Sequence, residues 1–546
     1  MVIRRVLAPR IDFGALRREL GLPEGFPAAA QREADQAAGA PLPAVPDRTD
    51  VPFVTVDPAT SRDLDQAMHL SRRSGGGYRV RYAIADVASH VRPGGALEEE
   101  TWRRGQTVYL PDGNVPLHPH SLSEGAASLL PDADRAAVLW TIDLDADGET
   151  VGVALERARV RSRAKLDYVG VQLAADAGRL PEPIALLPEI GALLTARGLR
   201  RGAVNLPLPE QDVEPQGDGW RLVLRGPGPM EDHNAQISLL TGMAAADIML
   251  AGRIGLLRTM PAPKPEAVQR LRLAAGPLGV HWPDGMSVGE VLAGLDAAQP
   301  RAAAFIDQAA ELMRGAAYTA FDGESPEQPE HGGVAAAYAH VTAPLRRLAD
   351  RYATEVCLAL HEGREVPDWA RAALPKLPEV MATTDRTASA ATRGAIELAE
   401  AVLLSHRVGE TFEAAVLDVD APRPAPEVPR QPDHAGPEQP AGQTGGAVAV
   451  PGPSGGTGVA VEPERPGERA GAAGRTGGGA GRPGAGSGRS GGNGGGRAGR
   501  PPGGTVALDE PPVRARCLGD LPLGERVRVR LVTADPTERK VLFERA

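Results

Sequence analysis

Three acidic side chains and one amide crowd the stretch VTVDPATSRDLDQAMHL: Asp57, Asp63, Asp65 and Gln66. Two unit charges about 5 Å apart repel each other by roughly 3 kcal/mol at an effective dielectric constant near 20, so a positive group is expected between the carboxylates. Carboxylate oxygens suit Mg²⁺ or Mn²⁺, which also take water and phosphate oxygens. Aspartate serves turns and helix caps as well, and the spacing alone leaves both interpretations open.

Two strands joined by a turn are expected to position these carboxylates. Asp57 ends the strand pattern FVTVD, and Pro58 interrupts it. Asp63 and Asp65 stand at the start of the next strand pattern, LDQAMHL, where period-two spacing puts them on one face. The turn between the two strands then brings Asp57 back beside them.

A pair of adjacent arginines lies much further along the chain, in the stretch AYAHVTAPLRRLADR. Thr342 and Pro344 predict the N-cap region and first turn of a helix that continues beyond Leu348. Arg346 and Arg347 then oppose the helix macrodipole, so an anion bound at this end would be favourable. The alternative is a solvated pair of surface charges.

The totals for the whole chain limit the classes of function. The 546 residues are too many for one core, and the formal charge of −10 argues against a generic polyanion binder. Any nucleic-acid role must therefore come from local basic clusters. We expect no signal peptide and no membrane span. Cys357 and Cys517 fit neither a disulfide framework nor a zinc site, and a reducing cytoplasm is the simplest interpretation.

The chain divides into three regions by pattern. Residues 1–49 form an N-terminal extension with a short helix in FGALRREL and little further structure. Residues 50–405 predict one large α+β domain, with a strand in YRVRYAIA, a short helix in ALEEETWRRG and a hairpin in DRAAVLWTIDLDADGETVGVALERARVRS. Residues 406–546 predict a small β-barrel, because alternating strands flank a long insertion. The insertion, 421–504, is rich in Gly and Pro and predicts disorder.

An ordered set of motifs resembles the RNase II/RNase R family of 3′→5′ exoribonucleases. The aspartate stretch resembles the family signature of Asp, five residues, Asp, any residue, Asp, Asp, with Gln66 in place of the fourth aspartate. The blocks that begin YAIADVASHV and AYAHVTAPLRR resemble two further family blocks, and LGERVRVRLVTADPTERKVLFE resembles the last strands of the family's OB-fold RNA-binding barrel. The resemblance implies an α+β RNB-type catalytic domain followed by this barrel, and hydrolysis of single-stranded RNA to nucleoside 5′-monophosphates.

The resemblance also implies the metal ligands. Asp57, Asp63 and Asp65 match the family's Mg²⁺-binding aspartates, with Mn²⁺ as a substitute, and Gln66 would be a neutral ligand at best. Asp65 matches the carboxylate on which cleavage depends most, and Asp63 would support it. We therefore expect Asp65→Asn to remove nuclease activity and leave folding intact.

Substrate-binding residues follow in the same way. Tyr109 matches the aromatic that stacks a base near the 3′ end, and the family's opposing aromatic falls near Leu206. Arg346 matches the arginine that holds the scissile phosphate, and it is also counted as catalytic, with Arg347 beside it. The partner that these residues imply is single-stranded RNA, and we expect a monomer.

Three departures from the family pattern keep a second hypothesis open. Gln66 is neutral, an acidic pair on a central helix is replaced by Ser238 and Leu239, and the family's paired N-terminal cold-shock barrels do not fit into residues 1–49. The alternative to an exoribonuclease is an RNA-binding protein on the same scaffold with weak or no nuclease activity. A weaker third hypothesis is a metal-dependent phosphoesterase that acts on a small substrate.

Overall fold

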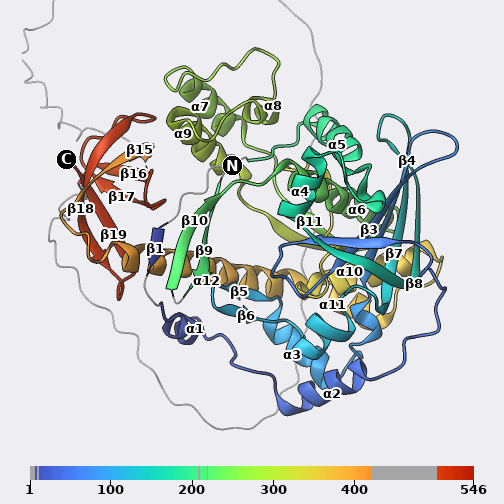
Figure 1. Ribbon diagram of the computed structural model, residues 1–546. Helices are drawn as coiled ribbons and strands as arrows, with labels where there is room; N and C mark the ends of the chain where they lie inside the picture. The colour runs from blue at the N-terminus through green and yellow to red at the C-terminus, as the bar shows by residue number, and fades with distance from the viewer. Residues whose placement is uncertain (1–5, 9–10, 207–208, 218, 421–500) are drawn as a thin grey trace, which may run out of the picture. The chain divides into compact units, whose positions relative to one another are not determined.

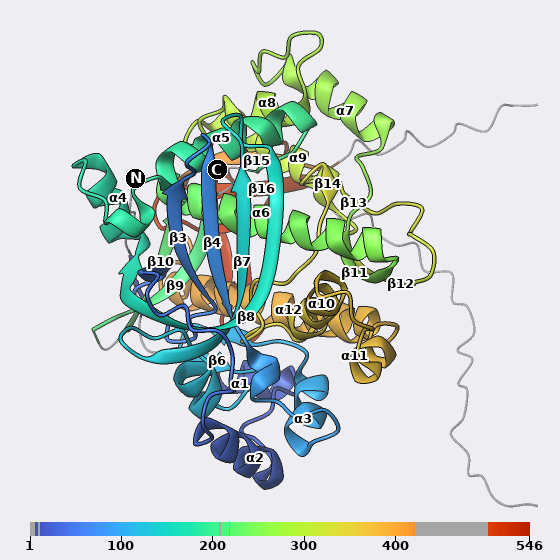
Figure 2. The same cartoon turned by 90° about the vertical axis from the view of Figure 1, so that its right-hand side faces the viewer.

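A closed barrel of five strands carries the aspartate stretch in the computed structural model of the chain (Figures 1 and 2). The structure describes all residues except 1–5, 9–10, 207–208, 218 and 421–500. The strand order in this barrel is β2-β3-β4-β7-β8, with bounds Phe53–Asp57, Gln66–Arg72, Tyr78–Ala85, Asp134–Leu144 and Thr150–Asp167. Alternate residues of β4 are buried, namely Tyr78, Val80, Tyr82 and Ile84, as the alternation predicts. The antiparallel pairing of β7 with β8 confirms the predicted hairpin.

Helices and short strands surround this barrel. Helix α3, Ala96–Arg104, ends at Gly105 with φ +63°, as the sequence predicts. The later helices are α4 Tyr168–Asp176, α5 Leu187–Arg201, α6 Pro229–Gly252, α7 Pro265–Ala275, α8 Val288–Ala293, α9 Pro300–Ala309, α10 Leu348–His361, α11 Asp368–Ala373 and α12 Leu377–Leu404. The short strands are β1 Val6–Ala8, β5 Val108–Leu110, β6 Gly113–Val115, β9 Glu210–Gln216, β10 Gly219–Arg225, β11 Ile254–Thr259, β12 Ala317–Asp322, β13 Glu330–His331 and β14 Ala336–Ala337.

One helix in the described part of the chain, α6, is long and apolar enough to cross a membrane by length and composition alone. Its best window has a mean hydropathy of 1.3, and 44% of that window is buried inside the protein. The core helix of a globular domain passes the same test, and α6 packs against α5, α10 and β11. This packing accounts for the apolar composition of α6.

The N-terminal extension contains more structure than the sequence predicts. Helix α1, Gly14–Glu19, confirms the short helix in FGALRREL. A second helix, α2, spans Ala28–Ala38 in a region expected to have little structure. Ala30 and Ala34 of this helix are buried in one cluster with Leu97 of α3. Alanine has the highest helix propensity, and docking on α3 supplies the burial that the extension lacks by itself.

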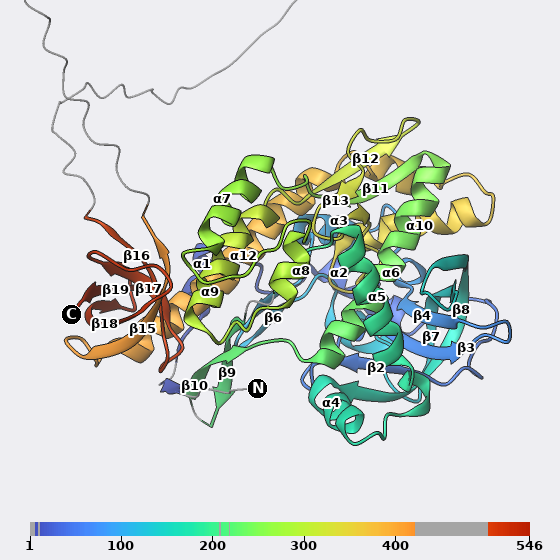
Figure 3. The same ribbon diagram turned by 90° about the horizontal axis from the view of Figure 1, so that it is seen from above.

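The C-terminal strands form a second closed barrel, as predicted, from both sides of residues 421–500 (Figure 3). Its strand order is β15-β16-β17-β19-β18, with bounds Thr411–Val419, Gly503–Leu508, Arg514–Leu518, Arg526–Asp535 and Lys540–Arg545. Most of the segment predicted to be disordered, residues 421–500, lies outside the described residues. The predicted end of this segment at residue 504 is wrong, because Gly503 and Gly504 belong to β16, where they pair with Leu518 and Cys517 of β17.

The strands on either side of residues 421–502, β15 and β16, pair with each other in this barrel. Val419 pairs with Gly504, and the backbone N–H of Asp420 donates to the Gly503 carbonyl at 2.8 Å. We therefore expect that a two-residue Asn-Gly turn can replace residues 421–502, because this turn suits antiparallel neighbours. The melting temperature should stay unchanged or rise by a few degrees, because shortening the connection from residues 421–502 to two residues lowers the closure cost by roughly 3 kcal/mol. Insoluble protein, or a fall of more than about 5 °C in thermal unfolding, would contradict this.

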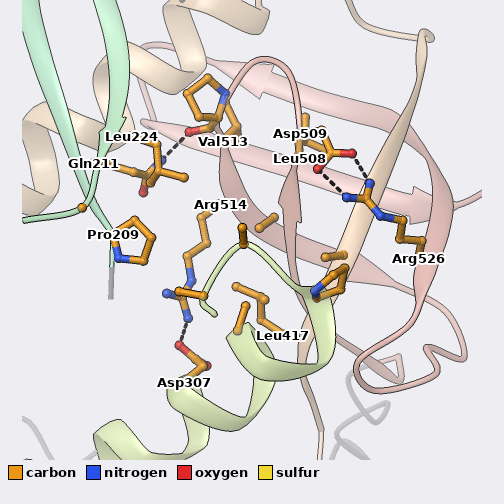
Figure 4. Close-up of a pocket in the computed structure, with 18 of the residues that line it drawn as sticks. Pro209, Gln211, Leu224, Asp307, Leu417, Leu508, Asp509, Val513, Arg514 and Arg526 are labelled. Carbon is orange, nitrogen blue, oxygen red and sulfur yellow. Dashed lines mark hydrogen bonds and ion pairs between the residues drawn. The ribbon is translucent and has the colours of Figure 1, made fainter. Parts of the chain in front are cut away.

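A small polar network joins the second barrel to α12 and the β9–β10 hairpin, and Figure 4 shows its members Gln211, Arg514 and Asp307. The Glu400 carboxylate of α12 accepts hydrogen bonds from the Gln211 amide at 2.8 Å and from the Arg514 backbone N–H at 2.9 Å. Gln211 also donates to the Pro512 carbonyl at 2.7 Å, and the Arg514 guanidinium pairs with Asp307 of α9. Burial raises the pKa of Glu400 to about 7. A cavity of about 550 Å³ lies between these segments.

Candidate active site

The three aspartates lie at one end of the first barrel, where β2 ends and β3 begins. Asp57 is the last residue of β2, and Asp65 immediately precedes β3, which begins at Gln66. Asp63 and Asp65 therefore lie in the loop before the strand, and the predicted strand start is two residues too early. Lys165 of β8 holds this loop by donating to the carbonyls of Ala59, at 2.7 Å, and Ser61.

Burial dominates the electrostatics of Asp57 and Asp65, and Asp63 acts on both. Asp57 is 8% exposed and Asp65 is 1% exposed. Burial raises the pKa of Asp57 to about 6 and that of Asp65 to about 8, and the nearby Asp63 carboxylate pushes both pKa values further upward. Arg346 opposes both shifts with its positive charge. The site is therefore short of positive charge.

Arg346 approaches the same carboxylate from a distant part of the chain. The Leu345 backbone N–H donates to Asp65 Oδ1 at 2.8 Å, and Arg346 Nε lies 3.7 Å from Asp65 Oδ2. The Arg346 side chain remains 44% exposed, so its other N–H groups are available to an anion. The structure places Arg346 beside Asp65, whereas its predicted role toward a phosphate stays a prediction.

Arg347 lies in a different environment. It donates through Nε and Nη2 to Asp350 at 3.0 and 2.8 Å, and Asp350 is fully buried. Asp350 also accepts the Ala343 backbone N–H at 2.6 Å. Helix α10 therefore starts only at Leu348, after Arg347 as its N-cap residue, and the predicted helix start at Thr342 is wrong. A substrate-binding role for Arg347 stays a prediction, and its hydrogen bonds favour an internal structural role.

Tyr109 projects from the β5–β6 hairpin toward the aspartates. Its side chain is 46% exposed, and its hydroxyl donates to Asp63 Oδ2 at 2.6 Å. Tyr109 and Tyr168 both line one cavity of about 660 Å³ beside the aspartate site. Leu206, where the opposing aromatic was expected, packs instead in the cluster around Phe305. Tyr168 was missed because only the fold, through the end of β8 and the start of α4, places it near Asp57.

Gln66 and Ser238 meet at a third residue, Thr342. The Gln66 side-chain amide donates to the Thr342 carbonyl, and the Ser238 and Thr342 hydroxyls are 2.8 Å apart. Ser238 also lies beside the hydroxyl of buried Tyr82. The amide nitrogen of Gln66 is thus committed to the backbone, and only its oxygen could serve the predicted metal site.

The residues present fit a divalent cation by their chemistry. Among the residues that the structure describes, no three His, Cys, Asp or Glu side chains form a preformed metal-binding group. However, Asp57 Oδ2 and Asp65 Oδ2 are buried oxygens without a hydrogen-bond partner. Buried carboxylate oxygens of this kind require a counter-ion or a proton. Asp57, Asp65 and the less buried Asp63 are therefore the residues that would hold Mg²⁺.

Comparisons with known proteins show which proteins the chain resembles in sequence and in fold. Ribonuclease R of Vibrio cholerae is 27% identical over 460 residues, which cover 77% of this chain and 54% of that protein. The chain spans about half the length of the curated relatives it matches. The solved structure of Mycoplasma genitalium RNase R with ribose-methylated single-stranded RNA superposes with a TM-score of 0.73 at 16% identity, over 97% of this chain and 77% of that one. Yeast Ssd1, a pseudonuclease, superposes with a TM-score of 0.57 at 17% identity, over 69% and 48%.

Two family matches cover the first barrel and four of the five strands of the second. The RNase II-type exonuclease C-terminal S1 domain matches residues 496–546, which include β16 to β19. The RNB domain matches residues 46–360, more than half of the chain, and includes the aspartate loop and Arg346. The chain therefore belongs to the RNB domain family, the family of 3′→5′ exoribonucleases to which ribonuclease R belongs.

Proposed function

We propose that this protein is a hydrolytic 3′→5′ exoribonuclease that degrades single-stranded RNA to nucleoside 5′-monophosphates with the help of Mg²⁺. The observation that carries the proposal is the pairing of Asp65 with Arg346, which places an unsatisfied carboxylate 3.7 Å from a partly exposed guanidinium. Such a site can bind a cation and a phosphate side by side. RNA degradation and RNA binding by relatives support the same substrate class.

Each residue has one task in the proposed reaction. Arg346 holds the scissile phosphate with its free N–H groups, because guanidinium geometry matches phosphate oxygens. Tyr109 stacks the base near the 3′ end, and its bond to Asp63 fixes the ring next to the carboxylates. Asp57, Asp63 and Asp65 hold the cation. When bound, Mg²⁺ polarises the scissile phosphate and lowers the pKa of the attacking water.

An RNA-binding protein without nuclease activity is the second candidate. Gln66 and Ser238 favour it, because each leaves a neutral side chain where the resemblance implies an acid. The fold similarity to Ssd1 also shows that this architecture occurs in a pseudonuclease. The structure of the aspartate loop favours the enzyme, since buried carboxylates without a ligand are costly and a binding scaffold has no need of them.

Purified protein incubated with 3′-labelled single-stranded RNA and Mg²⁺ tests the proposal. We expect labelled nucleoside 5′-monophosphate from the first turnover, no release with EDTA, and poor hydrolysis of the matched DNA, because a ribose-reading channel uses the 2′-hydroxyl. If the protein binds the RNA but cleaves no more of it than the Asp65→Asn protein does, the second candidate is established. Activity on a small phosphodiester that oligo-RNA does not inhibit would establish a phosphoesterase instead.

Tyr109→Ala should weaken binding of short RNA oligomers or lengthen the end product. Loss of one stacked base corresponds to about 1–3 kcal/mol, or roughly a five- to 150-fold weaker Kd. Tyr109→Phe is the matched control, because it keeps the ring and removes only the hydrogen bond to Asp63. Fluorescence anisotropy with a labelled tetramer measures both variants. Equal affinity of Tyr109→Ala and wild type would exclude a stacking role.

A further inference from the structure

Two neutral side chains, Gln66 and Ser238, stand at positions where the resemblance implies acids, and one residue connects them. The Gln66 amide donates to the backbone carbonyl of Thr342, while the Thr342 hydroxyl lies 2.8 Å from the Ser238 hydroxyl. Thr342 itself is 3% exposed. The start of β3, the middle of α6 and the segment before α10 are therefore joined by hydrogen bonds that involve no formal charge.

This bridge fixes the segment that carries Arg346. Gln66 holds the segment at Thr342, and the adjacent Asp65 holds it three residues later through the Leu345 backbone N–H, at 2.8 Å. Asp350 holds the Ala343 backbone N–H at 2.6 Å between these two points. Asp65 and Gln66, which are adjacent at the start of β3, thus fix the position of the backbone that carries Arg346.

A carboxylate at position 66 could not make the same contact. An ionised Asp or Glu only accepts hydrogen bonds, so its oxygen would face the Thr342 carbonyl oxygen in a partly buried site. That arrangement needs a proton or a cation between the two oxygens. The amide of Gln66 supplies the donor directly, and no ion is required at this point.

We propose that Gln66 is a positioning residue: with Thr342 and Ser238 it forms a neutral bridge that holds Arg346 against Asp65, instead of binding the metal. The catalytic consequence rests on the proposed nuclease function, whereas the bridge itself does not. The sequence prediction of Gln66 as a weakened metal ligand is the competing hypothesis. The two hypotheses predict opposite effects of an acid at position 66.

Kinetics of three variants distinguish these hypotheses. Gln66→Glu should lower kcat about tenfold or more at saturating Mg²⁺, with KM for RNA changed less than about threefold, because a displaced Arg346 segment impairs the chemical step. Thr342→Val removes only the hydroxyl link and should lower kcat by about fivefold, whereas Thr342→Ser keeps that link and should stay within about twofold of wild type. Gln31→Glu is the matched control, since Gln31 donates to Asp35 at 2.9 Å on the distant helix α2.

Hydrogen–deuterium exchange of a peptide that covers residues 342–348 tests the bridge without activity. It should exchange faster in Gln66→Glu and Thr342→Val, while peptides from α9 and β18 exchange as in wild type. If wild-type protein shows no turnover, the nuclease proposal fails, and the exchange result still decides on the bridge. Unchanged exchange, or faster exchange with unchanged kcat, overturns the positioning role. A Gln66→Glu protein with undiminished kcat and a lower Mg²⁺ requirement would show that the residue is a metal ligand.

Discussion

Asp65→Asn should abolish RNA degradation, with kcat lowered by about 10³-fold or more, and should leave the protein folded. Asp65 is the most buried of the three carboxylates, it contacts the Arg346 segment, and its Oδ2 has no hydrogen-bond partner. The asparagine keeps an oxygen that can accept the Leu345 N–H, but it carries no charge. Removal of one preorganised electrostatic group lowers the rate by about 10²–10³-fold, and the loss of a metal ligand lowers it further.

The same variant has a stability signature that follows from the pKa of Asp65. Burial raises this pKa to about 8, so the fold favours the protonated form over the ionised form. The ionised carboxylate therefore destabilises the fold increasingly as the pH rises from about 4 to 8. Asp65→Asn lacks this penalty, so its melting temperature in EDTA should equal or exceed that of wild type at pH 8, with a smaller difference at pH 5.

Thermal unfolding at both pH values, alongside the RNA assay, checks this prediction. Asp35→Asn is a suitable control, because Asp35 is an exposed acceptor on α2, far in sequence from the site. A variant that unfolds at a much lower temperature would mean that Asp65 is needed for the fold. A variant that degrades RNA at the wild-type rate would contradict the assignment of Asp65 as the central carboxylate.

Local patterns predicted those elements whose stability comes from alternation and short turns. The strand with Tyr78 and Ile84, the β7–β8 hairpin and both halves of the C-terminal barrel are examples, because period-two burial is visible in the sequence itself. Helix α2 was missed although Ala30, Ala34, Ala37 and Ala38 follow helical spacing, because alanine is a weak apolar signal and its burial here depends on packing against α3. The aspartate cluster was predicted from spacing and family resemblance. In the structure, Asp63 lies near enough to raise the pKa values of both Asp57 and Asp65, and a shared metal site of the three stays a prediction.

The parts of the site that sequence could not predict depend on contacts between distant segments. The start of α10 was placed too early because Thr342 and Pro344 suit a helix start, while Asp350 and Asp65 hold the intervening backbone in another conformation. The orientation of the Gln66 amide depends on Thr342, which lies 276 residues away. Neither contact can be recognised from the residue pattern within a single segment of the sequence.

The adjacent arginines should separate cleanly into one that acts on RNA and one that maintains the fold. Arg346→Met should lower kcat/KM on RNA by about 10²–10³-fold and should destabilise the protein less than Arg347→Met does, because Arg346 is 44% exposed and lies 3.7 Å from Asp65. Arg347→Met should instead destabilise the protein by about 3–5 kcal/mol, since it leaves the fully buried Asp350 carboxylate without its positively charged partner.

Urea unfolding and RNA kinetics on this matched pair decide between the roles. The Arg347→Met protein that remains folded should retain affinity for RNA within about threefold, because the guanidinium of Arg347 is already committed to Asp350. If Arg347→Met keeps its stability and loses RNA affinity, then Arg347 binds substrate directly, as the sequence suggested. If Arg346→Met instead unfolds easily and turns over RNA normally, the phosphate is held elsewhere, and Arg346 serves only to neutralise Asp65 within the carboxylate cluster.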